Sequence, residues 1–281
     1  MSRDIYAEVT NALVATIEAN PGDPMMPWHR GGASEVPRNI ASEQEYQGVN
    51  ILNLWVRGQI AGYSSNIWGT FNQWRKLGAQ VRKGEKSTPV IFYKQVRKEG
   101  ADGEEETYRV LKSFPAFNAD QVDGWDAPQP RQADVFERLE DVEHAVSATG
   151  AIIREGGDRA FYSPATDIVH MPNRSLFFGT SSGTREENFY AVLWHELAHW
   201  TGHPSRCDRD LRNRFGSEAY AMEELVAELG AAFCCARLGI SPAPREDHAQ
   251  YLANWLKVLK SDKKAIFTAA AKAQAAVDYL L

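Results

Sequence analysis

The stretch H-E-L-A-H at residues 195–199 decides how the C-terminal half of this sequence folds and what chemistry it can hold. On an α-helix, residues four apart lie about 40° from one another around the axis, so His195 and His199 emerge from one face and can share a metal ion. Glu196 is turned from His195 by roughly 100°, which lets its carboxylate reach a metal-bound water without binding the metal. The pattern predicts a zinc centre in which Glu196 is the catalytic base, accepting a proton from a water that attacks a carbonyl.

The residues around this motif indicate that the helix is buried. Its apolar positions gather on one side and comprise Phe189, Val192, Leu193, Leu197 and Trp200. Glu196 falls inside this apolar sector, where a carboxylate is unfavourable unless it has a chemical role. If the histidines were only a surface pair, Glu196 would lie among polar neighbours. The pattern therefore favours a metal site on a helix that we expect to run from Arg185 to Thr201.

A catalytic zinc takes a third protein ligand and leaves one position open for water. The next predicted helix, residues 217–238, places Glu224 and Glu228 four residues apart at the margin of its apolar sector. Either can be the third ligand, and the other is then expected to hydrogen-bond a ligating histidine. Glu223 is expected on the opposite, solvated side of this helix. The same ligands also accept manganese or another divalent metal in place of zinc.

Two alternative metal arrangements were weighed against this one. His203 lies four residues beyond His199, but Gly202 and Pro204 bracket it, so the helix is expected to have ended there. A loop histidine near the site is the preferred interpretation of His203. A di-iron carboxylate bundle needs a second Glu-x-x-His motif besides Glu196 to His199, and the sequence contains none.

The rest of the chain predicts an α+β fold with two domains. We expect a small N-terminal α+β domain at residues 1–119, a polar linker at 120–132 and an α-rich domain with the metal site at 133–281. The strand predicted at Phe161 to Met171 precedes the metal helix, where by analogy an edge strand would pair with an extended peptide. A plain core strand explains the same residues. The helices and strands are expected at residues 4–19, 50–61, 70–77, 88–96, 107–117, 134–147, 152–153, 159–172, 185–201, 217–238, 246–259 and 263–281.

Composition places the chain among globular proteins that work inside the cell. Of its 281 residues 43 % are hydrophobic and 24 % are charged, and no apolar run is long enough to span a membrane. The first residues lack the basic start and apolar core of a signal peptide. The three cysteines, Cys207, Cys234 and Cys235, match no disulfide framework and no zinc-finger spacing. We therefore expect a cytoplasmic protein with no membrane partner.

The N-terminal half has the charge and aromatic content of a nucleic-acid-binding domain. Residues 70–98 contain eight basic residues against one acid, Glu85, although the whole chain has a net charge of −6. Aromatic residues alternate with these bases, and planar rings that stack on bases beside cations that contact phosphates suit single strands. The competing interpretation is that most of the rings form the core of a small domain. The residues expected to bind DNA are Trp28, Arg30, Arg38, Trp74, Arg75, Lys76, Arg82, Lys83 and Lys86.

Several blocks of this sequence resemble ArdC-type antirestriction proteins. In the N-terminal half these blocks are P-R-N at 37–39, Y-Q-G-V-N at 46–50, W-G-T-F-N-Q at 68–73, L-G-A-Q-V-R-K-G-E-K at 77–86 and F-N-A-D-Q-V at 117–122. In the C-terminal half they are H-E-L-A-H-W-T-G-H at 195–203 and E-E-L-V-A-E-L-G at 223–230. The second half also resembles the glutamate-ligated zincins, whose Glu-x-x-x-Asp motif favours Glu224 as the ligand. Glu228 departs from that motif by replacing its aspartate.

The resemblance implies plasmid-borne proteins that bind single-stranded DNA and protect incoming conjugative DNA from host restriction enzymes. It also implies a zincin-like metallopeptidase domain, whose protein substrate would be a component of a restriction system. Two other functions stay open. The chain can be a DNA-binding protein with a structural or vestigial metal site, or a general intracellular zinc protease whose basic stretch binds an acidic protein.

Overall fold

The computed structural model describes residues 4–19, 35–99, 105–126, 135–180, 183–211, 217–240 and 248–281. The chain divides into two compact units: unit 1 comprises Met1–Val36 and Gln129–Leu281, and unit 2 comprises Pro37–Pro128. Both units contain helices and strands, and the predicted α+β fold class is confirmed. No helix within the described ranges combines the length and the apolar character that crossing a membrane requires.

Unit 2 is built on a mixed sheet in which the strand order is β1-β2-β5-β4. Two clusters of buried side chains hold this unit together, one around Leu54 and Trp68 and the other around Trp74 and Val122. A second small sheet pairs β3 with β6. The elements are β1 (Arg38–Asn39), α2 (Val49–Ala61), β2 (Ile67–Gly69), α3 (Phe71–Lys76), β3 (Gln80–Val81), β4 (Thr88–Glu99), β5 (Glu105–Asn118), the 3-10 helix η2 (Ala119–Gln121) and β6 (Val122–Asp123).

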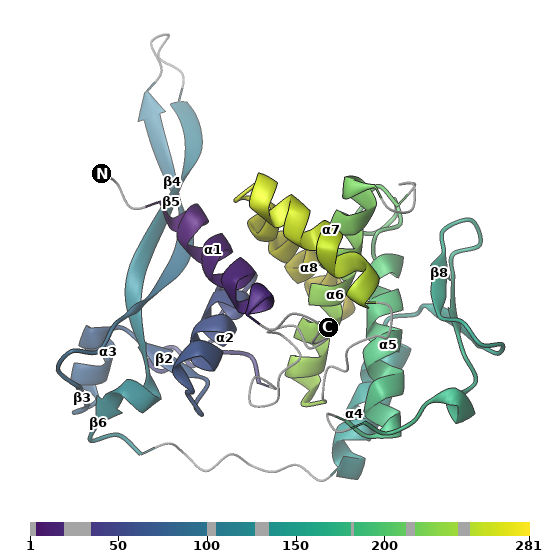
Figure 1. Ribbon diagram of the computed structural model, residues 1–281, viewed down its shortest axis with the longest axis horizontal. Helices are drawn as coiled ribbons and strands as arrows, with labels where there is room; N and C mark the ends of the chain where they lie inside the picture. The colour runs from purple at the N-terminus through teal and green to yellow at the C-terminus, as the bar shows by residue number, and fades with distance from the viewer. Residues whose placement is uncertain are drawn as a thin grey trace. The chain divides into compact units, whose positions relative to one another are not determined.

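The β4–β5 hairpin is much longer than the rest of its sheet and extends away from unit 2 as a two-stranded ribbon (Figure 1). At the base of the hairpin, the side-chain amide of Asn50 in α2 makes hydrogen bonds to β4 of the kind that a neighbouring strand would make. The Asn50 amide donates to Ile91 O at 2.8 Å, and Ile91 N donates back to Asn50 Oδ1 at 2.8 Å. Asn53 adds a bond to Pro89 O at 2.7 Å. Two side-chain amides on one helix thus pair with the outer edge of β4 where it enters the sheet.

Unit 1 is a helical assembly with a small sheet. Its helices are α1 (Ile5–Glu18), α4 (Val135–Ala148), α5 (Arg185–Trp200), α6 (Glu218–Leu238), α7 (His248–Ser261) and α8 (Ala265–Leu280), and η3 (Arg174–Leu176) is a 3-10 turn. The helix α6 packs against α5, α7 and α8, and 14 of its 21 residues are buried. It is therefore the central element of the unit. A helix buried in this way must be apolar on nearly every side, and the sequence of α6 is apolar except mainly at its glutamates.

The sheet of unit 1 lies beside α5 and has the strand order β7-β9-β8. Its strands are β7 (Ile152–Glu155), β8 (Phe161–Ser163) and β9 (Ile168–Met171). The inner face packs Val169 and Met171 completely out of solvent. Because β8 pairs with β9 on one side only, β8 is an edge strand within the described residues. The sequence analysis expected one strand over residues 159–172, and the turn between Ser163 and Ile168 divides it into a hairpin.

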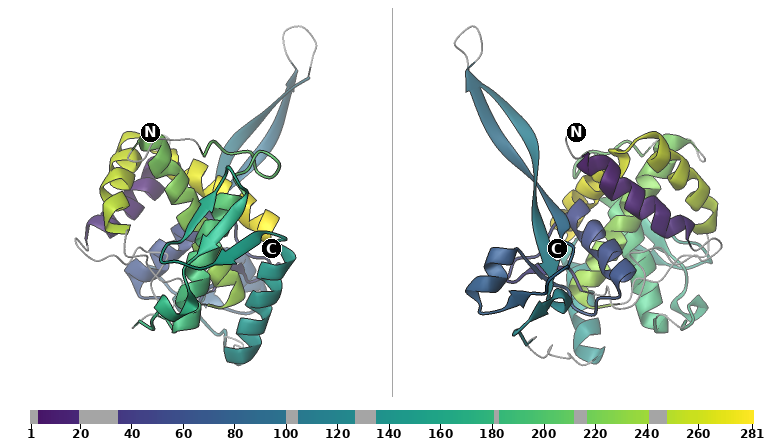
Figure 2. Two further views of the ribbon diagram at one scale, coloured as in Figure 1. Left: turned by 90° about the vertical axis from the view of Figure 1, so that its right-hand side faces the viewer. Right: turned by 60° about the vertical axis from the view of Figure 1, so that its left-hand side comes forward.

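The N-terminal helix α1 associates with unit 1, although the sequence analysis assigned residues 1–119 to a single domain. Thr10 Oγ1 donates to Lys263 O at 2.8 Å, and the Tyr6 and Phe267 rings lie 4.6 Å apart. Figure 2 shows α1 beside the C-terminal helices in both views. The apolar stripe of α1 (Val9, Leu13, Val14 and Ile17) is buried, and this burial is the physical reason why the helix packs there.

The first part of the predicted linker, residues 120–126, belongs to unit 2. Gln121 is fully buried, and its amide donates to Glu85 Oε2 at 2.9 Å. Val122 joins the second core cluster through β6. The polar, turn-rich composition of this segment concealed a short helix and strand that close the small sheet. Residues 127–134, which complete the predicted linker, lie outside the described residues.

Candidate metal centre and nucleic-acid surface

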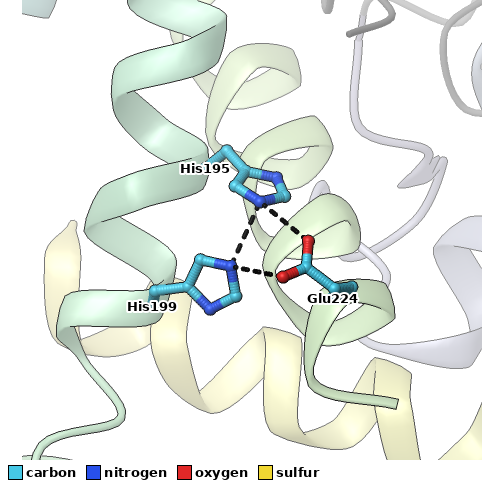
Figure 3. Close-up of side chains that lie close together, drawn as sticks. All are labelled: His195, His199 and Glu224. Carbon is cyan, nitrogen blue, oxygen red and sulfur yellow. Dashed lines mark hydrogen bonds and ion pairs between the residues drawn. The ribbon is translucent and has the colours of Figure 1, made fainter. Parts of the chain in front are cut away.

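His195, His199 and Glu224 meet between α5 and α6 (Figure 3). The two imidazole Nε2 atoms are 3.2 Å apart. The Glu224 carboxylate faces both rings, with Oε2 at 3.5 Å from His195 Nε2 and Oε1 at 3.5 Å from His199 Nε2. His195 and Glu224 are buried and His199 is nearly so. The three predicted metal ligands therefore converge on one point, with their donor atoms turned inward.

These separations fit a divalent metal. Two ligand atoms that are each about 2.1 Å from a tetrahedral ion lie about 3.4 Å from one another. The three observed edges of 3.2, 3.5 and 3.5 Å are close to this value. Two imidazole nitrogens this close also need a proton or a cation between them, because their lone pairs repel. The donor set of two imidazoles and one carboxylate is one that zinc and manganese both accept.

Close contact between the two helices brings the ligands together. Gly230 of α6 lies against Ala198 of α5, so that a Cβ atom at position 230 would lie only 3.0 Å from the Ala198 Cβ. Both helices begin at well-formed caps: Thr184 and Glu187 form a capping box at α5, and Ser217 caps α6. These caps fix the start of each helix, and hence which residues face the partner helix.

Glu196 lies beside the cluster, and its carboxylate is bound to the edge strand. Its side chain is buried, and its Oε2 accepts a hydrogen bond from the backbone N–H of Tyr162 at 3.0 Å. Tyr162 belongs to β8, so the free side of that strand is the side that faces the metal helix. The arrangement places an oriented carboxylate next to the three predicted metal ligands, as the expected role of Glu196 as a general base requires.

The Nδ1 atom of each of these two histidines, on the side of the ring away from the cluster, lies close to a carboxylate. Glu228 Oε2 lies 3.5 Å from His195 Nδ1. Glu223 Oε1 lies 3.2 Å from His199 Nδ1. Only the first of these partners was among the predicted possibilities, since Glu223 was expected to be solvated. Its side chain is in fact only 11 % exposed.

Arg209 explains why Glu223 can be buried. Its guanidinium binds the Glu223 carboxylate with two nitrogens, at 3.0 Å from Nε and 2.9 Å from Nη2. It also donates to the Thr201 hydroxyl at 2.9 Å and to Ala198 O at 2.6 Å. Arg209 thus connects the C-terminal end of α5 to α6 and balances the charge of Glu223. No sequence pattern indicates this role, because Arg209 lies in a loop outside any motif.

The charges of the cluster change the ionisation of its members in the absence of a metal. Burial alone lowers the pKa of His199, but the charge of Glu224 and the hydrogen bond to Glu223 raise that pKa to about 10. Burial raises the pKa of Glu224, but His199 and His195 hold it well below its usual range. The site is thus strongly cation-attracting, and a bound divalent ion would replace the proton that His199 otherwise holds.

We expect Glu223→Gln to weaken metal binding by about 10- to 100-fold, because the partner that orients a ligating histidine is lost as a charged acceptor. The measurement is a competition titration of Zn²⁺ or Mn²⁺ between the full chain and a chromophoric chelator. Glu218→Gln is the matched control, since Glu218 is on the same helix and its exposed side chain pairs with Lys257 at the surface. Equal affinities for the two variants would show that Glu223 has no influence on the metal.

A second arginine holds the edge strand to the end of the metal helix. The Arg206 side chain is 6 % exposed, and its Nη2 lies 2.5 Å from Asp167 Oδ1 and 3.2 Å from the Tyr162 hydroxyl. Its Nε donates to Trp200 O at 2.7 Å, and the guanidinium lies over the Trp200 ring at 3.8 Å. The Tyr162 hydroxyl donates to Asp167 at 2.8 Å. These contacts fix where β8 lies relative to Glu196.

Replacing Arg206 with methionine is expected to lower the free energy of unfolding by about 1–2 kcal/mol at neutral pH, as the hydrogen bonds to a partly exposed carboxylate are lost. The hydrogen bond from Arg206 lowers the pKa of Asp167 in the folded state. The part of the stabilisation that comes from Asp167 is therefore complete above the unfolded pKa of about 4 and is lost as the pH falls through the lower folded pKa. Urea unfolding of the metal-free wild type and variant should give a stability difference that narrows in acid, and the contacts with Trp200 account for what remains; a difference that stays the same at every pH would contradict the role of Asp167.

His203, the competing ligand, is not among the side chains whose ligand atoms converge. Its Nδ1 lies 2.8 Å from Ser205 Oγ, in the loop that follows α5. That loop begins at Thr201, where the helix ends. The structure therefore supports the interpretation of His203 as a loop histidine, because the chain turns before it can reach the site.

The predicted DNA-binding residues separate into two classes. Lys76, Lys83 and Lys86 are exposed on unit 2, as is Arg75. Arg38 and Arg82 are also exposed but are engaged in ion pairs, Arg38 with Glu45 at 3.1 Å and Arg82 with Glu85 at 3.1 Å. Trp28 and Arg30 lie outside the described residues. The lysines and Arg75 thus form the described part of the basic surface that is open to a polyanion.

Trp74 is not on that surface. It is completely buried, its Nε1 donates to Phe117 O at 3.1 Å, and its ring packs edge-on against Trp125 at 5.2 Å. The expectation that Trp74 stacks on DNA is corrected by this burial. On the short helix α3, Trp74 faces the core while its neighbours Arg75 and Lys76 face solvent. The exposed ring of this helix is Phe71, at 41 %.

Comparison with known proteins assigns both parts of the chain. Residues 140–272 match the zincin-like metallopeptidase domain, and residues 3–122 match the N-terminal domain of the anti-restriction factor ArdC. The metal-free crystal structure of a plasmid antirestriction protein ArdC has a TM-score of 0.80 to this chain at 37 % identity, covering 99 % of this chain and 97 % of that one. The chain belongs to the ArdC antirestriction family. For the same plasmid ArdC, a Mn(II)-bound structure matches equally well, with a TM-score of 0.80 at 36 % identity.

Relatives of this ArdC family member differ in length. The uncharacterized protein y4eC of Sinorhizobium fredii is 44 % identical over 99 % of this chain and 91 % of its own length. The DNA primase TraC of Escherichia coli is 36 % identical over all of this chain, which spans only 27 % of the primase. The same pair of domains thus also occurs as one part of a much larger protein.

Proposed function

We propose that this ArdC family member binds single-stranded DNA through unit 2 and hydrolyses peptide bonds at the metal centre of unit 1. In this way it would protect incoming plasmid DNA from restriction in the cytoplasm of a bacterial cell. The observation that carries the proposal is the convergence of His195, His199 and Glu224 with the buried carboxylate of Glu196 beside them. A purely structural metal site has no need of a fourth, oriented acid.

The roles of the residues follow from the geometry. His195, His199 and Glu224 would hold the metal, zinc or manganese, which supplies Lewis-acid polarisation of a carbonyl and lowers the pKa of a water. Glu196 would accept a proton from that water and pass it to the leaving amine. Its bond from the Tyr162 N–H holds one carboxylate oxygen in place, so that the acid needs little reorganisation during the reaction. Glu223 and Glu228 would orient the ligating imidazoles.

An extended peptide segment is the substrate that this site suits best. A peptide lying alongside the edge strand β8 would pair with those backbone groups of its open side that Glu196 does not occupy, since the Tyr162 N–H is already bonded to that carboxylate. The protein substrate that we propose is a component of a restriction system, which links the peptidase to the antirestriction family. The Arg206 contacts would keep β8 at a constant distance from the reacting carbonyl.

Support for single-stranded DNA comes from unit 2. Arg75, Lys76, Lys83 and Lys86 are exposed there, and exposed rings lie among them. A protein that contacts several phosphates in this way loses affinity steeply as salt rises, with a slope of about −0.7 per phosphate for single strands. Weak salt dependence, or equal affinity for polyglutamate, would favour a protein partner in place of DNA.

The decisive experiment on the whole proposal compares antirestriction by the wild type and by Glu196→Gln in recipient cells that receive unmodified plasmid DNA. Loss of protection by the variant, at equal protein level and equal DNA affinity, would support a role for proteolysis. Full protection by the variant would favour the second candidate, a DNA-binding protein that acts without cleavage. The observation that supports this second candidate is the exposed basic surface of unit 2.

A further inference from the structure

Unit 2 contains a hollow of about 490 Å³ that belongs to none of the sites described above. This volume lies within the roughly 300–1,000 Å³ that small-molecule sites in proteins occupy. The hollow is open to solvent and is lined by the start of α3, the small β3–β6 sheet and the loop that follows β3. It therefore has room for one nucleotide-sized group, on the same surface as the exposed cations of unit 2.

The inner wall of the hollow is apolar and aromatic. Val81 and Phe117 form its floor, since Val81 is buried and Phe117 packs on the second core cluster. Phe71 stands at its side with 41 % of its surface exposed. An exposed phenylalanine at the edge of an apolar floor is unfavourable in water, but it is a stacking platform for a planar ring.

The rim carries both hydrogen-bond donors and acceptors. Gln80 and Asp123 face each other across the two strands of the small sheet. Arg82 is fixed in the wall by Glu85 at 3.1 Å, by Asp123 at 3.4 Å and by Asp120 O. A site for phosphate alone would present only donors. A mixed rim around an aromatic floor suits the edge of a nucleobase, which has donors and acceptors together.

Cations flank the hollow where the backbone of a strand would leave it. Lys83 lines the hollow and is exposed, next to the turn at Gly84. Arg75 is four residues beyond Phe71 on α3, so it lies beside that ring on the same helix face. The ring and the cations are therefore arranged for a base that is bonded to a sugar and a phosphate.

We propose that this hollow receives one unpaired nucleobase, which stacks on Phe71 while the neighbouring phosphates contact Lys83 and Arg75. The inference rests on the proposed binding of single-stranded DNA and adds where a base is held. A base inside a duplex cannot enter, because both its faces are stacked and its edge is paired. The hollow would therefore let unit 2 distinguish single strands from duplex.

The test uses the full chain and a short fluorescein-labelled single-stranded oligonucleotide, with affinity measured by anisotropy. Phe71→Ala should weaken binding by roughly 5- to 150-fold, the effect of losing one stacked base. Phe71→Trp should keep an affinity for the oligonucleotide close to that of the wild type, because the indole also offers a stacking surface. Ile60→Ala is the matched control, because Ile60 is another exposed apolar residue of unit 2, 57 % exposed, that does not line the hollow. Equal affinity of Phe71→Ala and Ile60→Ala would overturn the proposal.

A strand of the same length without bases separates this inference from the general proposal. The wild type should bind the abasic strand more weakly than the normal strand, and Phe71→Ala should lose most of that discrimination. If the wild type bound both strands equally, DNA binding would stand and the base site would be refuted. If the wild type bound neither strand, the proposed DNA-binding function itself would fail.

Discussion

Glu196→Gln is expected to lower the rate of peptide hydrolysis by about 10²- to 10⁴-fold, the usual contribution of a general acid–base. Glutamine has the same shape, and its amide oxygen can still accept the hydrogen bond from Tyr162 N–H that measures 3.0 Å in the wild type. It cannot take up a proton at neutral pH. The change therefore removes the chemistry while it preserves the position of the side chain and of β8. Hydrolysis of fluorescently labelled casein by the metal-loaded protein is the measurement.

Metal content and DNA affinity are the controls for this variant. The Zn²⁺ or Mn²⁺ bound per chain should equal that of the wild type, because Glu196 is not one of the three converging ligands. Affinity for single-stranded DNA should also be unchanged, since unit 2 contains the basic surface. A variant that kept its hydrolytic rate would exclude Glu196 as the base. A variant that lost DNA affinity would contradict the independence of the two functions.

The second large effect is expected at Trp74, where substitution by alanine should lower the free energy of unfolding of unit 2 by about 3–5 kcal/mol. The side chain is completely buried among Val81, Val122 and Trp125, and its indole N–H is bonded to Phe117 O. Removing it leaves both a cavity and an unpaired carbonyl oxygen. Urea unfolding of the full chain, followed by far-ultraviolet circular dichroism, should show the transition of unit 2 at lower denaturant.

Trp74→Phe and Arg75→Ala separate stability from DNA binding. Phenylalanine fills most of the space of the indole, so Trp74→Phe should fold and bind DNA with wild-type affinity. Arg75→Ala changes an exposed residue of the same helix and should leave stability nearly unchanged while it weakens DNA binding. A folded Trp74→Phe protein with strongly reduced DNA affinity would restore the role in base stacking that the sequence suggested.

One physical difference explains why the side chains predicted as metal ligands converge while Trp74 is buried rather than exposed. H-E-L-A-H determines its own geometry, because a helix with four-residue spacing fixes where both imidazoles point. An aromatic residue among basic ones carries no such constraint, since the same indole can face the core or the solvent. On α3 the choice depended on β3 and β6, because Val81 and Val122 pack against Trp74 and β6 comes from far along the chain. No local pattern reveals that packing.

The surroundings of the metal ligands were predictable in part. The position of Glu224 and Glu228 on one face of α6 followed from periodicity, and the structure brings both towards His195. Glu223 was expected in solvent because it falls outside the apolar sector. It is buried because Arg209, 14 residues earlier in the chain, binds it from a loop. An ion pair between a loop and a helix depends on tertiary structure alone, so helical periodicity could not indicate it.

The contact between Gly230 and Ala198 has a consequence for how such a centre changes over evolution or by design. The predicted ligands come from α5 and α6, and the distance between these helices is set by Ala198 and Gly230, which are not themselves ligands. A methyl group at position 230 would force the helices apart by a few tenths of an ångström, and the carboxylate would recede from both imidazoles. Substitutions at this contact could thus change the size of ion that the site prefers, while all three predicted ligands stay in place. Substitution of Gly230 by a slightly larger residue is therefore a single change that would widen the coordination sphere.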